Sequence, residues 1–181
     1  MMRFIFSFLL VALSVNSLAQ SNYLMVMGGG GEPKGSPSTI FDAELASIGA
    51  FAKTNPHWQS SVIFDGGHAQ TEAIVSQHFG RFNSAGQTFS GKNFEALIAL
   101  YERRLNSGEI KSGDKLLIHI NSHGALRNAS AEETHRISTS DAAMTNLQTL
   151  GGVTVPLDRL KQLTELAAKK GVKLGIVDLS C

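Results

Sequence analysis

Short apolar runs alternate along the chain with stretches in which apolar residues recur every three or four positions. A continuous apolar run is typical of a strand buried on both faces, and the wider spacing is typical of an amphipathic helix. The runs cover residues 23–27, 58–64, 115–121 and 172–181, and the helical stretches cover residues 41–52, 69–79, 94–105 and 157–167. The pattern therefore predicts an α/β domain with a parallel sheet and helices on both faces.

Local signals place the ends of several elements. We expect Asn93 to cap the third helix and Gly108 to end it. We expect Pro156 to open the fourth helix and Gly171 to form its left-handed cap. Residues 125–152 are polar and without clear period, apart from residues 136–139, which we expect to pair in a small hairpin.

The first 19 residues have the features of a secretory signal peptide. Arg3 precedes an apolar run, and Ala19 closes a small-residue site at which signal peptidase would cut. The run is too short to span a membrane, so we expect residues 1–19 to be removed and residues 20–181 to form one exported domain, secreted or periplasmic in a bacterium. The net charge of +1 and the scattered basic residues argue against nucleic acid or a membrane surface as a partner.

The strongest chemical signal lies at the ends of the last two apolar runs. His123, followed by Gly124, comes after one run, and Cys181, the single cysteine, ends the other. The carboxyl ends of parallel strands meet at one edge of a sheet, where binding sites lie. An imidazole beside a thiol can activate it as a nucleophile, and a glycine after the histidine lets a carbonyl approach a backbone N–H. A lone cysteine is otherwise a buried bystander or an intermolecular link.

The motifs S-H-G, ending at Gly124, and D-L-S-C, ending at Cys181, together with the order of elements, resemble the caspase-like cysteine peptidases of clan CD. The resemblance implies a caspase-like three-layer α/β/α fold with a mostly parallel sheet. It implies an endopeptidase that cleaves a peptide or protein substrate through a thioester acyl-enzyme, without a cofactor. In that scheme His123 is the general acid/base, Cys181 is the nucleophile, and the N–H groups of Gly124 and Cys181 form the oxyanion hole.

The chain departs from the family pattern near its last residue. Many members carry an acidic residue or glutamine two positions before the cysteine, where this chain has Leu179, with Asp178 one position earlier. The family continues beyond the cysteine, so we expect the domain at residues 20–181 to lack its C-terminal strands, to need a missing C-terminal fragment, and to be inactive alone. The alternatives are a non-catalytic caspase-fold binding module, an inactive truncated product, and an unrelated flavodoxin-like domain with an incidental cysteine.

A run of glycines after the first strand is a further candidate for the site. In a caspase-like fold this loop borders the substrate cleft, to which we assign Gly28, Gly29, Gly30, Gly31, Glu32 and Asp178. A phosphate-binding loop is disfavoured, because Gly35 follows Lys34 where that motif requires Ser or Thr.

The other histidines do not predict a metal site. Metal-binding histidines stand at characteristic spacings, which these residues lack: His57, His68, His78 and His135. His119 lies inside the third apolar run, and we expect it to be a core histidine whose polar atoms have hydrogen-bond partners. We therefore expect no metal.

Overall fold

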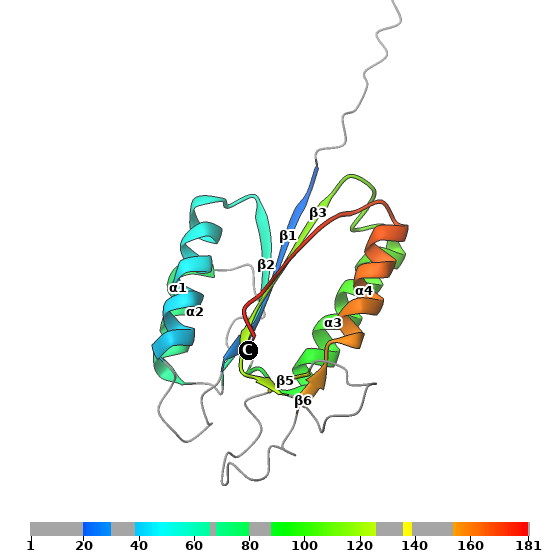
Figure 1. The fold of residues 1–181 in the computed structure, drawn as a ribbon. Coiled ribbons are helices and arrows are strands. Elements are labelled where there is room, and N and C mark those ends of the chain that lie inside the picture. Colours follow the sequence, from blue (N-terminus) through cyan, green and yellow to red (C-terminus); the bar gives the residue numbers. More distant parts are fainter. Residues whose placement is uncertain are drawn as a thin grey trace, which may run out of the picture.

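The computed structural model describes residues 20–29, 39–65, 68–79, 88–125, 136–138 and 154–180, which form helices and strands (Figure 1). The elements are β1 (Asn22–Gly29), α1 (Thr39–Thr54), β2 (Trp58–Phe64), α2 (Ala69–Phe79), α3 (Gly91–Ser107), β3 (Lys115–Ser122), β4 (Gly124–Ala125), β5 (Arg136–Ser138), β6 (Thr154–Pro156), α4 (Asp158–Lys169) and β7 (Lys173–Asp178). No helix among these residues is both long enough and apolar enough to span a bilayer. The expected signal peptide, residues 1–19, lies outside the described residues.

Four parallel strands form the main sheet, in the order β2-β1-β3-β7. Asn22 at the start of β1 pairs with Trp58 of β2 on one side and with Lys115 of β3 on the other. Lys115 in turn pairs with Lys173 of β7. Helices α1 and α2 cover one face of this sheet, and α3 and α4 cover the other (Figure 1). The predicted parallel sheet with helices on both faces is confirmed.

Each face of the sheet has its own apolar core, and alternate residues of β1 divide between them. Tyr23, Met25 and Met27 pack with the side chains of α3 and α4, whereas Leu24 and Val26 pack with those of α1 and α2. Successive strand residues point to opposite faces, so a strand covered on both sides is apolar at every position. This double burial explains the continuous apolar run in the sequence.

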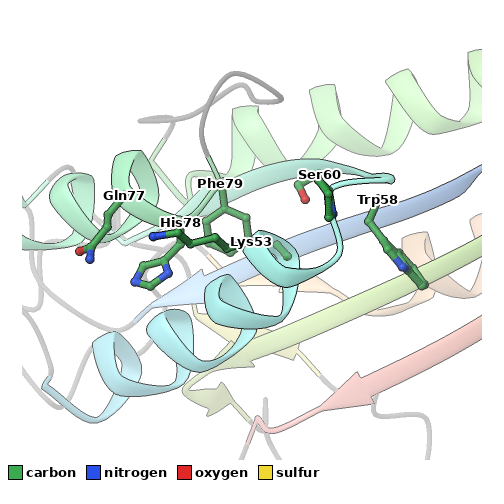
Figure 2. A pocket seen from close by; sticks show the side chains of 8 residues that line it. Lys53, Trp58, Ser60, Gln77, His78 and Phe79 are labelled. Carbon is green, nitrogen blue, oxygen red and sulfur yellow. The ribbon is translucent and has the colours of Figure 1, made fainter.

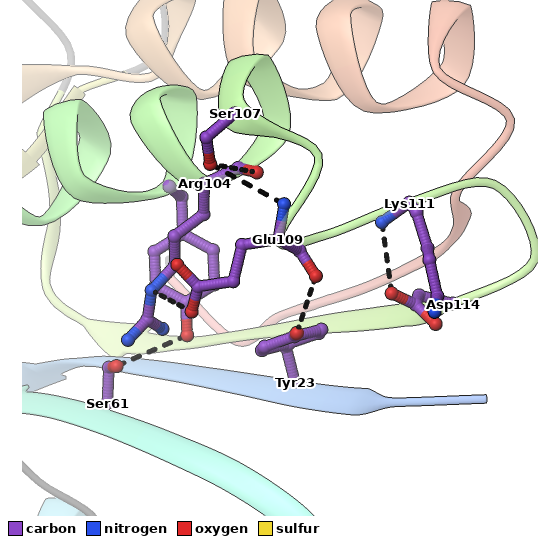
Figure 3. A network of polar contacts seen from close by, with 8 residues as sticks. Tyr23, Ser61, Arg104, Ser107, Glu109, Lys111 and Asp114 are labelled. Carbon is purple, nitrogen blue, oxygen red and sulfur yellow. Dashed lines mark hydrogen bonds and ion pairs between the residues drawn. The ribbon is translucent and has the colours of Figure 1, made fainter. Parts of the chain in front are cut away.

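Polar side chains at the amino end of the sheet are paired with one another (Figure 3). The hydroxyl of Tyr23 donates to the carbonyl of Glu109 at 3.1 Å, and Nε of Arg104 lies 3.1 Å from Glu109 Oε1. The buried carboxylate of Asp114 accepts the N–H of Lys111 at 3.0 Å. These contacts tie the segment after α3 to the starts of β1 and β3. Since each group has its partner, we assign this end of the sheet a structural role.

A second, antiparallel sheet has the order β4-β5-β6 and lies by the carboxyl end of the main sheet (Figure 1). Gly124 of β4 pairs with Ile137 of β5, which pairs with Val155 of β6 on its other side. The pairing expected at residues 136–139 is thus confirmed for residues 136–138, with β5 as the middle strand, and residue 139 lies outside the described residues. The small sheet fixes the backbone immediately after His123.

The last strand is exposed, whereas the sequence predicted a buried one. β7 is the outermost strand of the described sheet, and Ile176 and Val177, on its opposite faces, are 49% and 40% exposed. An apolar run reports which residues form a strand, but it does not report whether that strand lies at the centre or at the edge of its sheet. The prediction was therefore right about the element and wrong about its burial.

Two predicted helix starts were also wrong, while two predicted ends were right. Ser90, and not Asn93, caps α3: its hydroxyl accepts the N–H of Asn93 at 3.1 Å. Pro156 belongs to β6, and α4 begins two residues later. Gly108 and Gly171 follow their helices with φ of 78° and 73°, the left-handed conformation that favours glycine.

Candidate active site

His123 lies directly beyond β3 at the carboxyl edge of the sheet, and its side chain is exposed. Gly124 follows at once as the first residue of β4. Phe41, in the first turn of α1, packs edge-on against the imidazole of His123, with ring centroids 4.9 Å apart and planes at 87°. The imidazole therefore has a defined aromatic neighbour although it stands beyond the end of the strand.

β7 delivers the residues before Cys181 to the same edge. Ile120 pairs with Asp178, and the N–H of Leu179 donates to the carbonyl of Ile120 at 2.9 Å. Asp178 is exposed, and its Oδ1 accepts the N–H of Ser180 at 2.9 Å and the hydroxyl of Ser180 at 2.6 Å. A carboxylate that accepts an N–H two residues on forms an Asx turn, so the chain turns at this point. Cys181 itself lies outside the described residues.

Gly28 and Gly29 end β1 with φ of 145° and 109° and are buried. A Cβ on Gly28 would lie 2.5 Å from the carbonyl carbon of Asn121, and one on Gly29 would lie 2.6 Å from Cα of Asp65. The carbonyl of Gly29 accepts the hydroxyl of Ser122 at 2.8 Å. The two glycines thus let the ends of β2 and β3 close in on β1. The remaining residues assigned to the cleft lie outside the described part: Gly30, Gly31 and Glu32.

Two buried aspartates meet one threonine beside this edge. Asp65 follows β2, Asp42 lies in the first turn of α1, and they are 1% and 3% exposed. The hydroxyl oxygen of Thr71, in α2, lies 2.8 Å from Asp42 Oδ1 and 3.0 Å from Asp65 Oδ2. A hydroxyl carries one proton and donates to one carboxylate at a time. Burial, aided by the charge of Asp65, raises the pKa of Asp42, which favours its protonated form.

Asp65 has two further features of a constrained site. Among the described residues it is the one non-glycine with a positive φ, 53°, a conformation that is sparsely populated outside glycine, asparagine and aspartate. Nε2 of His68 lies 3.8 Å from its Oδ1, which is within range of charge attraction but beyond a hydrogen bond. Sequence reasoning missed this group, because 29 residues separate Asp42 from Thr71 and no motif joins them.

A row of polar side chains on β3 leads to the same edge. His119, Asn121 and His123 alternate along the chain and so share the face that α1 covers. His119 and Asn121 are buried, and within the described residues His119 Nδ1 and Asn121 Nδ2 have no hydrogen-bond partner. Burial lowers the pKa of His119, which favours its neutral form. His119 is buried as predicted, but the hydrogen-bond partner expected for each of its polar atoms is lacking at Nδ1. Asn121 was missed because it lies within an otherwise apolar run.

The described part of the chain also has a surface pocket of about 220 Å³ (Figure 2). Its wall comes from the end of α1, the start of β2 and the end of α2, with Trp58, Phe79 and Lys53 among the lining side chains. Since β2 runs from this pocket towards the carboxyl edge, the pocket lies at the opposite end of the sheet from His123. In the regions that the structure describes, no three His, Cys, Asp or Glu side chains gather as a metal site requires.

Comparison of the chain with protein-family models, with curated proteins and with solved structures found no match. The functional argument therefore depends on the fold and on the residues at its carboxyl edge. They define an α/β protein whose polar, constrained site lies where parallel-sheet proteins bind their ligands.

Proposed function

We propose that this domain is a caspase-like cysteine peptidase in which His123 is the general acid/base and Cys181 the nucleophile. The register between β3 and β7 is the observation that supports it best. Ile120 pairs with Asp178, an offset of 58 residues that is constant along the two strands. Carried on along the sequence, the same offset matches His123 with Cys181. Each of the two residues follows the last paired position of its strand by three, so β3 and β7 lead both of them to the same edge of the sheet, where an imidazole and a thiol can meet.

The chemistry follows from this pairing. A cysteine thiol has an ordinary pKa of about 8.5 and is mostly protonated at neutral pH, so the nearby imidazole raises its reactivity by taking the proton. The sulfur attacks the scissile carbonyl, and the N–H groups of Gly124 and Cys181 stabilise the oxyanion. His123 then protonates the leaving amine. In the second half, His123 takes a proton from water, which hydrolyses the thioester and restores the thiol.

The contacts of Asp178 suggest how it contributes to the proposed peptidase. Its carboxylate already accepts two hydrogen bonds from Ser180. In the proposal it therefore sets the direction in which the chain approaches Cys181, in addition to bordering the substrate cleft. The exposed edge of β7 is where the additional strands implied by the resemblance would pair. The substrate is an extracytoplasmic peptide or protein, as export through residues 1–19 would require.

Cleavage of a diverse peptide library, read by mass spectrometry, tests the proposal. The protein is expressed from its complete coding sequence, and His123→Ala and Cys181→Ser are compared with His57→Ala, a change of an exposed histidine before β2. We expect the wild type and His57→Ala to cleave alike and the other two variants to be inactive. Cleavage that persists in Cys181→Ser contradicts the proposal. Absence of cleavage by the wild type also contradicts it, and favours a non-catalytic binding module.

A further inference from the structure

The orientation of the His123 ring is not set by strand pairing. The ladder of β3 with β1 ends at Ser122, so backbone hydrogen bonds of the main sheet stop one residue before the histidine. Its side chain is exposed and has several rotamers open to it. Among the described residues, the edge-on contact with Phe41 restricts the ring, because it places one aromatic group against the imidazole at 4.9 Å.

Phe41 is itself held firmly. Its ring is 8% exposed and belongs to the apolar core between the sheet and α1 and α2. The next residue, Asp42, is buried and hydrogen-bonded to Thr71, so the first turn of α1 is fixed at two consecutive positions. A helix terminus frays easily unless side chains anchor it, and here both anchors lie in the turn that meets His123.

A continuous series of contacts connects that turn to the sheet. The N–H of Asp65 donates to the carbonyl of Gly28 at 2.8 Å, which fixes Asp65 to the end of β1. Oδ2 of Asp65 lies 3.0 Å from the Thr71 hydroxyl oxygen, which lies 2.8 Å from Oδ1 of Asp42. One threonine therefore links four parts of the chain: the end of β1, the residue that follows β2, helix α2, and the start of α1. Phe41 follows at the end of the series.

We infer that Phe41 is a positioning residue for His123 and that the Asp42–Thr71–Asp65 cluster holds Phe41 in place. The catalytic meaning of this inference rests on the proposed function, but the restriction of the ring does not. An acid/base group must be held within a fraction of an ångström of its productive position, and a displacement of 1 Å can cost about 100-fold in rate. The cluster thus serves the site without touching a substrate.

The NMR signals of the His123 imidazole carbon-bound hydrogens provide the test. They are assigned by their loss in His123→Gln and recorded at about pH 9, well above the ordinary imidazole pKa of about 6.5, so that protonation does not contribute. The ring current of Phe41 displaces these signals from their positions in an unfolded chain. Phe41→Leu is expected to abolish the displacement, and Phe41→Tyr to retain it. Phe51→Leu is the matched control, since Phe51 packs against Trp58 at the other end of α1.

Thr71→Val extends the test to the cluster, because it keeps the shape of the side chain and removes the hydroxyl. We expect it to move the His123 signals partway towards their positions in an unfolded chain, which tests the role of the cluster even if Phe41→Leu does not fold. Unchanged signals in a folded Phe41→Leu would overturn the positioning role of Phe41. Unchanged signals in a folded Thr71→Val would overturn the role of the cluster in holding Phe41.

Alkylation of Cys181 by iodoacetamide separates this inference from the proposed function. We expect Phe41→Leu to slow alkylation roughly tenfold, within the range for a displaced catalytic group, and Phe51→Leu to leave it unchanged. If the imidazole signals move but alkylation in the wild type is independent of His123, the positioning role stands and the peptidase proposal fails. If alkylation depends on His123 and Phe41→Leu leaves it unchanged, the peptidase proposal stands and the positioning role fails.

Discussion

The substitution Gly28→Ala tests the close packing that forms the candidate site. The new Cβ would lie 2.5 Å from the carbonyl carbon of Asn121 and nearer still to its oxygen, at a backbone φ of 145°. An L side chain at a positive φ costs about 1–2 kcal/mol. Pushing apart a well-packed interior costs about 1–3 kcal/mol more. We therefore expect Gly28→Ala to lower the free energy of unfolding by about 3 kcal/mol, a large share of the roughly 5–15 kcal/mol typical of a domain.

Gly108→Ala is the matched control, because Gly108 also has a positive φ, 78°, but a Cβ there would meet no atom within 4 Å. It should cost only the conformational term, about 1 kcal/mol. Urea unfolding followed by the fluorescence of Trp58, the single tryptophan, measures both variants. With a slope of about 2 kcal/mol per molar, the expected difference of about 2 kcal/mol separates the two midpoints by about 1 M urea. Equal midpoints would refute the argument that Gly28 is required for the approach of β3 to β1.

Three other substitutions test single contacts by urea unfolding. Burial raises the pKa of Asp42 above its ordinary 3.8, so the wild type should lose stability as the pH rises from 3.8 through that raised pKa. Asp42→Asn should remove this loss, and equal pH dependences of the two proteins would contradict the prediction. Burial lowers the pKa of His119 below its ordinary 6.5, so the wild type should lose stability as the pH falls from 6.5 towards that lowered pKa. His119→Gln should lessen this loss, and a variant whose stability depends on pH as the wild type's does would be the contrary result. Ser90→Ala should lower the free energy of unfolding by about 1 kcal/mol, because it removes the acceptor of the Asn93 N–H. Ser76→Ala, at an exposed position of α2, should lower it less, and equal losses would argue against the cap.

The order of elements and the parallel sheet could be predicted from the sequence, because both follow from local periodicity. The bounds of β2 and α2 match the expected ranges, since Pro56 and Phe79 stand beside clear breaks in the apolar pattern. The left-handed caps were predictable for a related reason: at Gly108 and Gly171 a single residue type permits the required φ. Local signals were not always sufficient, since the cap predicted at Asn93 and the helix start predicted at Pro156 were wrong.

Features that depend on distant residues were not predictable. Asp42, Thr71 and Asp65 meet only because α1 and α2 pack side by side, and nothing in the local sequence of any of them reports the other two. The exposure of β7 depends on its place in the strand order, which an apolar run does not encode. Asn121 is a polar residue in a buried strand, and its significance appears only when its face of β3 is seen to lead to His123.

The rate at which iodoacetamide alkylates Cys181 tests the central claim most directly. It is measured from about pH 5 to about pH 9 in the wild type and in His123→Ala, with a short cysteine peptide as the reference for a free thiol. The proposed pairing of His123 with Cys181 predicts that the wild type reacts faster than the peptide at neutral pH and that His123→Ala falls to the rate of the peptide. Equal rates in the wild type and in His123→Ala across this range would contradict the account.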